Sequence, residues 1–324
     1  MLPPVSETLP FALIVAGPTA SGKSALALDV AERIGGTIIN ADSMQAYREL
    51  RVLTARPTEA EEARVPHRLY GVRPAAEAGS VAWWREAALA EMDATRAAGR
   101  VPILTGGTGM YFAALADGLA AIPDPGPEAR AEARRLLAAF GPAALHASLA
   151  KVDPATAARL RPSDGQRIAR AWEVWRGTGR GLVAWQDRRL PPAPWRFAAI
   201  RLDPPRETLR AAIATRFAAM LAGGALEEVR ALVAQDLDPA LPAMRAHGVP
   251  ELSAYLRGEI TLQEAGRRTE LVTGQYTKRQ ATWFRHHALA PLACTHTIHA
   301  RYADPAQFSE SDSACLFAFI ERMG

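Results

Sequence analysis

The sequence predicts an α/β fold: a parallel-sheet core flanked by helices, into which an all-helical domain is inserted. Three short apolar runs each end in a polar turn, and segments with helical periodicity lie between them. Strands that alternate with helices in this way form parallel sheets. Farther along, two Pro-rich stretches enclose an Ala- and Arg-rich segment without strand patterns, which indicates the inserted domain.

The core strands are expected at residues 11–16, 37–41, 101–104 and 197–202. Each is the short, mostly apolar run that a buried strand requires. Helices are expected at residues 23–34 and 80–98, and Ser80 is of the residue type that caps a helix N-terminus. Ligands of parallel sheets bind outside the carboxyl ends of the strands, so the active site is expected at the polar turns.

The stretches IPDPGP and LPPAPW set the limits of the inserted helical domain at residues 123 and 195. The core then comprises residues 1–122 and 196–324. Its second part is expected to contain helices at residues 207–221, 224–235 and 261–287. The sequence after Pro291 gives no clear pattern.

Composition narrows the functional class. The 324 residues are 49% hydrophobic, and 38 Lys and Arg against 34 Asp and Glu fit an anionic partner such as nucleic acid. Cys294 and Cys315 belong to no CxxC or Cys/His cluster, so neither a disulfide framework nor a structural zinc site is expected. Residues 1–10 lack a leader pattern, and no apolar run is long enough to span a bilayer. We expect a cytoplasmic monomer without a membrane partner.

The turn after the first strand has the pattern of a P-loop. Its glycines let backbone N–H groups face phosphate oxygens, Lys23 supplies a positive charge and Ser24 a ligand for Mg²⁺. The alternative is a Gly-rich turn with an exposed lysine. A P-loop binds a diphosphate or a triphosphate, so an ATP kinase would carry the same loop. The predicted diphosphate- or nucleotide-binding residues are Gly17, Pro18, Thr19, Ala20, Ser21, Gly22, Lys23 and Ser24.

Further sequence blocks follow the P-loop: NADSMQAYREL, TARP, VPHRLYGV, PILTGGTGMYF, QRIARAWEV, RFAAML, GALEEV, AMRAHGVPEL and YTKRQATWFR. In content and order they resemble the tRNA dimethylallyltransferase (isopentenyltransferase) family, from about residue 11 to residue 287. Two positions depart from the family pattern. RVLTARP stands where a DIGTAKP-like stretch is usual, and Val249 stands where a Tyr is common. Both departures concern local tRNA contacts.

The resemblance implies a P-loop NTPase-like sheet and the transfer of a dimethylallyl group from dimethylallyl diphosphate to N6 of the adenosine 3′ to a tRNA anticodon. Diphosphate would be released, with Mg²⁺, bound through Ser24, as the cofactor. The anticodon stem-loop is the implied partner of the inserted domain. An aryl amine is a weak nucleophile, so the reaction needs a base and cations that stabilise the leaving diphosphate.

Asp42, at the end of the second strand, matches the family's proposed general base. The alternative is an N-cap aspartate that opens the next turn, and both roles are compatible. Thr19, Lys23 and Arg216 match the catalytic, diphosphate-binding positions, although a mid-helix arginine is often a solvated face. Thr108 matches a position that contacts the target nucleotide, or is a turn threonine that satisfies its own backbone.

The predicted tRNA contacts fall into two sets. By resemblance they are Asp42, Ser43, Met44, Gln45, Thr108, Arg130, Gln166, Arg167, Ile168, Ala169 and Arg170. From the residues themselves, the charged side of one helix predicts phosphate contacts through Lys278, Arg279 and Arg285. Tyr276 and Trp283, two helical turns apart, indicate a packed face more than a base-stacking platform.

Two other functions share parts of this pattern. A P-loop small-molecule kinase has the same loop and sheet, but no apolar strand that ends in a Walker B-type Asp follows residues 101–104. A non-catalytic RNA-binding protein would use the basic helices, but the intact GKS sequence argues against it.

Overall fold

The structure is a computed structural model that describes residues 9–186, 188–302 and 310–323. The chain divides into two compact units, which are treated separately. The core unit comprises Met1–Ala116 and Ala193–Gly324, and the helical unit comprises Asp117–Pro192. The prediction that residues 1–10 carry no leader falls on a segment of which residues 1–8 lie outside the described residues.

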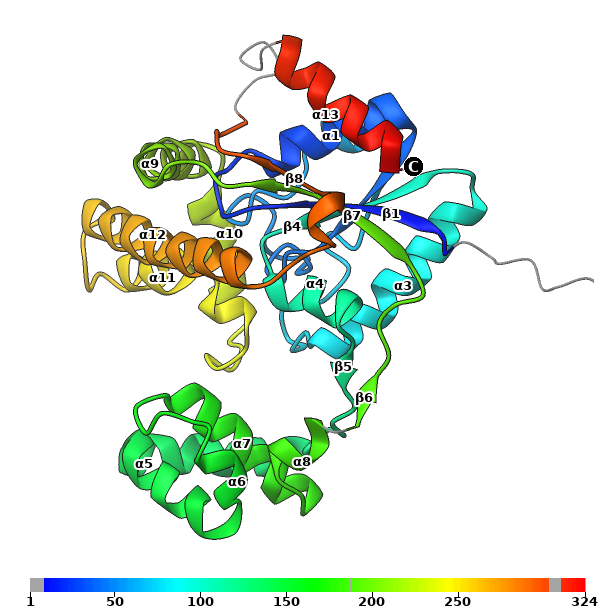
Figure 1. Ribbon diagram of the computed structural model, residues 1–324. Helices are drawn as coiled ribbons and strands as arrows, with labels where there is room; N and C mark the ends of the chain where they lie inside the picture. The colour runs from blue at the N-terminus through cyan, green and yellow to red at the C-terminus, as the bar shows by residue number, and fades with distance from the viewer. Residues whose placement is uncertain (1–8, 187, 303–309, 324) are drawn as a thin grey trace, which may run out of the picture. The chain divides into compact units, whose positions relative to one another are not determined.

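The core unit is built on a parallel sheet of six strands in the order β3–β2–β4–β1–β7–β8 (Figure 1). They are β1 (Phe11–Ala16), β2 (Gly36–Asn40), β3 (His67–Arg68), β4 (Val101–Gly106), β7 (Arg196–Leu202) and β8 (Thr295–Ile298). The parallel sheet and its four expected strands are confirmed. The two outer strands were not expected, because β3 has only two residues and β8 reads THTI, without an apolar run.

Alternate residues of β1 face two different helix layers. The helices flanking the sheet are α1 (Lys23–Ile34), α2 (Glu59–Arg64), α3 (Val81–Ala97), α4 (Gly109–Ala116) and α13 (Glu310–Met323). Leu13 and Val15 pack with α1 and α13, whereas Ala12 and Ile14 pack with α3 and α4 (Figure 1). Burial on both faces explains why the strand is a continuous apolar run. Ser80 caps α3 as expected, since its side chain accepts a hydrogen bond from the N–H of Trp83.

A further helical layer follows β7. It contains α9 (Arg206–Ala222), α10 (Ala225–Val233), the 3₁₀ turn η1 (Ala243–Arg245), α11 (Val249–Leu256), α12 (Leu262–His286) and, after them, the 3₁₀ turn η2 (Leu292–Cys294). The helices α9 to α12 and the turn η1 pack around the segment after β2, through Tyr47, Leu50 and Leu53. Among the described residues no single helix is long and apolar enough to cross a bilayer; α9 and α10, bent by 68° where they meet, reach that length and composition only together.

Backbone hydrogen bonds connect the carboxyl ends of β2 and β4. The N–H of Ala41 donates to the carbonyl of Thr105 (2.7 Å), and the N–H of Thr108 donates to the carbonyl of Ala41 (3.2 Å). A Cβ on Gly106 would lie 2.1 Å from the Ala41 backbone, so only glycine fits there. The indole Nε1 of Trp84, on α3, donates to the carbonyl of Asn40 (2.7 Å) and so fixes the end of β2. The turns after β2 and β4 therefore form one platform.

The helical unit has its own core. It contains α5 (Gly126–Val152), α6 (Pro154–Ala157), α7 (Gly165–Thr178), α8 (Leu182–Gln186) and an antiparallel ribbon of β5 (Leu119–Ala120) and β6 (Arg189–Leu190). Leu145, Leu149 and Ile168 lie at the centre of this core. The helix α5 is broken at Gly141, which has a φ of 75° and is followed by Pro142.

Two details differ from the sequence prediction. The unit is not entirely helical, because the two short strands carry too few residues to give a readable pattern. Its limits lie at Asp117 and Pro192 instead of residues 123 and 195. The strand pairing draws in residues before 123, whereas Trp195 packs in the core unit and is only 5% exposed.

Candidate active site

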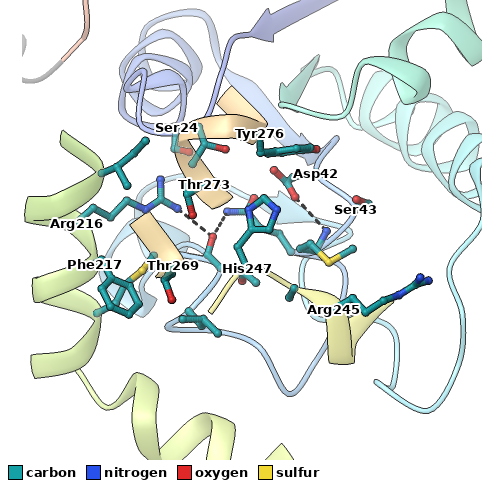
Figure 2. Close-up of a pocket in the computed structure, with 18 of the residues that line it drawn as sticks. Ser24, Asp42, Ser43, Arg216, Phe217, Arg245, His247, Thr269, Thr273 and Tyr276 are labelled. Carbon is teal, nitrogen blue, oxygen red and sulfur yellow. Dashed lines mark hydrogen bonds between the residues drawn. The ribbon is translucent and has the colours of Figure 1, made fainter. Parts of the chain in front are cut away.

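A cavity of about 360 Å³ opens in the core unit where the turns after β1 and β2 meet α9, the region of η1 and α12 (Figure 2). Its volume is in the range of pockets that bind small molecules. One end is polar and contains Thr19, Lys23, Ser24, Asp42 and Arg216. The apolar side chains of its wall are Leu53, Ile213, Phe217, Met220, Pro242 and Ala246, of which Ile213 packs beside the P-loop. The cavity thus combines a charged end with an apolar wall.

The P-loop turns back over Lys23, the first residue of α1. Gly22 precedes it with a φ of 90°, and Ala20 has a φ of 66°. The Lys23 ammonium donates to the carbonyl of Pro18 (3.4 Å) and is only 9% exposed. Burial lowers the pKa of Lys23 to about 8; nearby Asp42 opposes this effect, and Arg216 adds to it. A bound anion would restore the preference for the charged ammonium.

The C-terminal segment, which the sequence left without a reading, supports the P-loop. The N–H of Tyr302 donates to the carbonyl of Ser21 (2.9 Å), and the Arg301 Nε donates to the carbonyl of Ala20 (3.0 Å). A Cβ on Gly22 would lie 1.7 Å from the carbonyl oxygen of Tyr302, so glycine is required by both the turn and this contact. The loop is therefore held from outside the cavity.

Arg216 reaches the cavity from the middle of α9. Its Nη2 donates to the carbonyl of Thr54 (3.2 Å), and the side chain is half-buried, not a solvated helix face (Figure 2). Burial lowers the pKa of Arg216, while Asp42 opposes that shift. Two cationic side chains, Lys23 and Arg216, thus lie at the same end of the cavity.

Asp42 lies directly after β2 and lines the cavity. Its Oδ1 accepts a hydrogen bond from the N–H of Met44 (3.0 Å), and its own N–H donates to Oδ1 of Asn40 (2.8 Å) (Figure 2). Asn40 is in turn fixed through its Nδ2, which donates to the carbonyl of Leu69 (3.0 Å). Asp42 therefore does open the following turn, and its carboxylate is held in a defined orientation at the polar end.

Thr108 links the two turns of the platform. Its Oγ1 accepts from the N–H of Ser43 (3.0 Å) and lies 3.4 Å from Oγ of Ser43. Burial, together with the nearby Asp42, raises the pKa of Tyr276 to about 12, and the hydrogen bond between Tyr276 and Thr108 opposes this shift. Thr108 thus satisfies a neighbouring backbone group, not its own.

Gln45 holds the segment that departs from the resembled family. Its Nε2 donates to the carbonyls of Thr54 (2.9 Å) and Ala55 (2.8 Å). The Glu228 carboxylate accepts from three consecutive N–H groups, those of Arg51, Val52 and Leu53, at 2.6, 2.7 and 2.9 Å. Glu228 is on α10, and the sequence alone gave no role for it. These contacts set the position of Leu53 and Thr54 in the cavity wall.

The helix α12 presents two different sides. Lys278, Arg279 and Arg285 are exposed, as the charged pattern predicted. Tyr276 lines the cavity, with its ring edge-on to His247 at 4.9 Å, so it does not belong only to the packed face that its spacing indicates. Trp283 is half-buried against the core and stacks on His287 at 4.3 Å.

The predicted RNA contacts of the helical unit divide by exposure. Gln166, Arg167 and Arg170 are exposed, and nearby acids pair with the cations: Asp164 with Arg167 (3.5 Å) and Glu173 with Arg170 (3.2 Å). Arg130 is paired with Asp124. Ile168 and Ala169 differ from the prediction, because their side chains pack in the core of the unit, 0% and 8% exposed. An amphipathic helix places such residues inward at this spacing.

Sequence reasoning gave no role in the cavity to several of its residues. These are His247, Thr269, Thr273, Phe217, Met220 and Arg245. Burial and the nearby Arg279 lower the pKa of His247, which favours the neutral form of its ring. The sequence blocks RFAAML and AMRAHGVPEL contain four of these residues, but a matching block does not indicate which of its side chains point into a cavity. Among the described residues, no group of three or more His, Cys, Asp or Glu is arranged to hold a metal ion.

Comparison with known proteins decides the family. The family model for IPP transferase matches residues 45–287. The chain belongs to the IPP transferase family. Curated relatives include the tRNA dimethylallyltransferases of Granulibacter bethesdensis, 64% identical over 95% of this chain and 97% of the relative, and of Gluconacetobacter diazotrophicus, 65% identical over 95% and 93%. The family assignment does not favour the small-molecule kinase.

Solved structures agree with the family assignment. The tRNA isopentenylpyrophosphate transferase of Bacillus halodurans is 29% identical, covers 98% of each chain and has a TM-score of 0.67. A eukaryotic dimethylallyltransferase acting on tRNA shares the fold, with a TM-score of 0.79 over 97% of this chain and 80% of that chain, at 23% identity. This IPP transferase family member therefore shares its P-loop-like fold with both solved structures.

Proposed function

We propose that the chain transfers a dimethylallyl group from dimethylallyl diphosphate to N6 of the adenosine 3′ to the anticodon of a tRNA, with release of diphosphate. One observation carries this proposal: the cavity joins a P-loop lysine and an arginine from α9 to an apolar wall. Lys23 and Arg216 suit a diphosphate, and Phe217 and Met220 suit a short hydrocarbon chain. The ribose and base of ATP would instead place polar groups against that wall.

The leaving diphosphate is stabilised at the polar end. Lys23 and Arg216 absorb the negative charge that grows as the bond from carbon to oxygen breaks. The exposed Ser24 hydroxyl lines the cavity beside the loop, and hydroxyl and phosphate oxygens are ligands that Mg²⁺ takes together with water. Mg²⁺ bound there through Ser24 would neutralise diphosphate charge.

Asp42 acts as the base. The amine nitrogen of adenosine attacks the first carbon of the donor, the electrons of the breaking bond go to diphosphate, and the amine proton goes to the Asp42 carboxylate. The N–H of Met44 already fixes one carboxylate oxygen, so the group needs little reorganisation before the transfer. Thr19 lines the same end of the cavity and lies at the reacting region.

The tRNA is bound through exposed cations and the platform turns. Lys278, Arg279 and Arg285 on α12 contact backbone phosphates, as do the exposed Arg167 and Arg170, the partly exposed Arg130 and the neighbouring Gln166 of the helical unit. Ser43, Met44, Gln45 and Thr108 lie where the target nucleotide would enter. The base is extruded from its stack at a cost of about a few kcal/mol, which a single-stranded anticodon loop reduces. The protein acts as a cytoplasmic monomer.

Donor competition tests this proposal. Purified protein is incubated with Mg²⁺, an unmodified tRNA transcript and either labelled dimethylallyl diphosphate or labelled ATP, and the RNA is analysed by thin-layer chromatography. We expect label in the RNA from the prenyl donor alone. Transfer from ATP, or from neither donor, would overturn the proposal. Protein with Lys23→Met serves as the control for background transfer.

A further inference from the structure

Gln280 is a buried side chain of α12 that connects two loops of the site. It is only 4% exposed. Its Oε1 accepts hydrogen bonds from the N–H (2.8 Å) and the hydroxyl Oγ1 (3.2 Å) of Thr19 in the P-loop. Its Nε2 donates to the carbonyl of Gly107 (2.9 Å), in the turn after β4. One amide thus joins the P-loop to the turn that contacts the platform.

The partners of Gln280 determine the direction of its amide. A backbone carbonyl can only accept, so Nε2 must face Gly107, and a backbone N–H can only donate, so Oε1 must face Thr19. The Thr19 hydroxyl meets the same oxygen and therefore has to donate its proton to it. The oxygen lone pairs of Thr19 are then left for the cavity, which this residue lines.

Packing gives Gln280 little freedom to move. A Cβ on Gly107 would lie 2.2 Å from Nε2 of Gln280, and a Cβ on Gly109 would lie 2.3 Å from the ring of Trp283. Two successive turns of α12 therefore press on the glycines of the GGTG turn, and only glycine allows this approach. The contact is independent of the hydrogen bonds to Thr19.

We propose that Gln280 is a positioning residue for the transfer reaction and acts through Thr19, by fixing its place in the P-loop and the direction of its hydroxyl proton. This inference rests on the proposed function. Gln280 touches neither donor nor acceptor, because it is buried behind Thr19. The same helix carries Lys278 and Arg279 on its exposed side, so one rigid element joins the RNA-facing cations to the P-loop.

A double-mutant cycle tests whether the effect passes through the hydroxyl. Gln280→Met keeps the volume but removes the amide, and it is combined with Thr19, with Thr19→Ser and with Thr19→Val. We expect Gln280→Met to lower the single-turnover rate about tenfold when residue 19 is Thr or Ser, because a hydrogen bond to the hydroxyl is lost. When residue 19 is Val, which has no hydroxyl, Gln280→Met should lower the rate less than about twofold. The KM for tRNA should not change.

Gln275→Met is the matched control, since Gln275 is exposed on the same helix, and its rate should equal that of the unaltered protein. An equal loss in all three Thr19 backgrounds, or no loss, would show a packing role and overturn the inference. An unaltered protein that transfers no prenyl group would overturn the proposed function, and the inference with it.

Should Gln280→Met fail to fold, Gln280→Glu supplies the comparison. Glutamate keeps an oxygen that accepts from Thr19 but cannot donate to Gly107, and its added charge acts equally in every background. Thr19→Val, which removes the hydroxyl, should therefore reduce the rate in the Gln280→Glu protein as it does in the unaltered protein. Equal rates of Gln280→Glu with Thr19 and with Thr19→Val would overturn the inference.

Discussion

The two ends of the cavity are built in different ways. At the polar end, Lys23 begins α1 after the P-loop and Asp42 lies in the turn after β2, and hydrogen bonds to nearby backbone groups hold both side chains in place. At the apolar end, Phe217 and Met220 come from α9 and are held by packing with α10 to α12 and with the segment after β2. Two of the three charged groups at the polar end are therefore set by local turns, with Arg216 added from α9, whereas the fit of the donor depends on packing between distant segments. Changes at the two ends should have separable effects.

The largest effect is expected for Asp42→Asn. Asparagine keeps an oxygen for the N–H of Met44, so the turn survives, but it cannot accept the amine proton. The single-turnover rate should fall about a thousandfold, within the range for loss of a general base, with unchanged tRNA binding in a filter assay. A rate close to that of the unaltered protein would show that another group takes the proton.

Arg216→Gln should be next in size. It removes one of the two cations at the polar end, so the rate should fall about a hundredfold with every prenyl donor. Arg210→Gln is the matched control, because Arg210 is exposed on the same helix and does not line the cavity. Similar rates for the two variants would remove Arg216 from the leaving-group site. Quenched-flow measurement of labelled diphosphate release gives both rates.

A smaller and different effect is expected for Met220→Ala at the apolar end. The enlarged wall should accept a longer chain, so the ratio of kcat/KM for geranyl diphosphate to that for dimethylallyl diphosphate should rise about tenfold. Leu221→Ala is the control, since this neighbour lies outside the cavity. A general loss of rate without a change in the ratio would mean that Met220 supports the fold and does not select the donor.

The smallest effect is expected for Lys278→Gln, on the exposed side of α12. Loss of one phosphate contact should raise the KM for tRNA about threefold and reduce the slope of log affinity against log salt by about 1, with kcat unchanged. Lys278→Arg should restore both values. A fall in kcat at saturating tRNA would contradict a contact with phosphate alone. Steady-state kinetics between 50 and 200 mM salt would measure this.

Most of the fold could be predicted from local patterns. Apolar runs identify β1, β2, β4 and β7 because strands buried on both faces contain few polar residues. The pattern could not identify β8, whose THTI sequence becomes a strand only by pairing with β7. Nor could it show that Tyr302 packs on the P-loop, since that contact joins segments nearly a chain length apart.

The site was less predictable than the fold. Motif spacing identified Lys23, Ser24 and Asp42, since their roles depend on a single turn. Tyr276 has helical spacing typical of a core residue, but α12 forms a wall of the cavity, so the same spacing serves a ligand-facing side chain. Ile168 shows the opposite error, because a matching block includes residues that point inward. Gln280 carries no local signal, since its partners come from two other loops.

The most direct test of the central claim is analysis of the product nucleoside. An unmodified tRNA transcript with adenosine 3′ to the anticodon is incubated with the protein, Mg²⁺ and dimethylallyl diphosphate, digested, and examined by mass spectrometry. The proposed function predicts N6-dimethylallyladenosine at that one position, with one diphosphate released for each adenosine modified. Unmodified RNA, or a prenyl group at any other nucleotide, would contradict it.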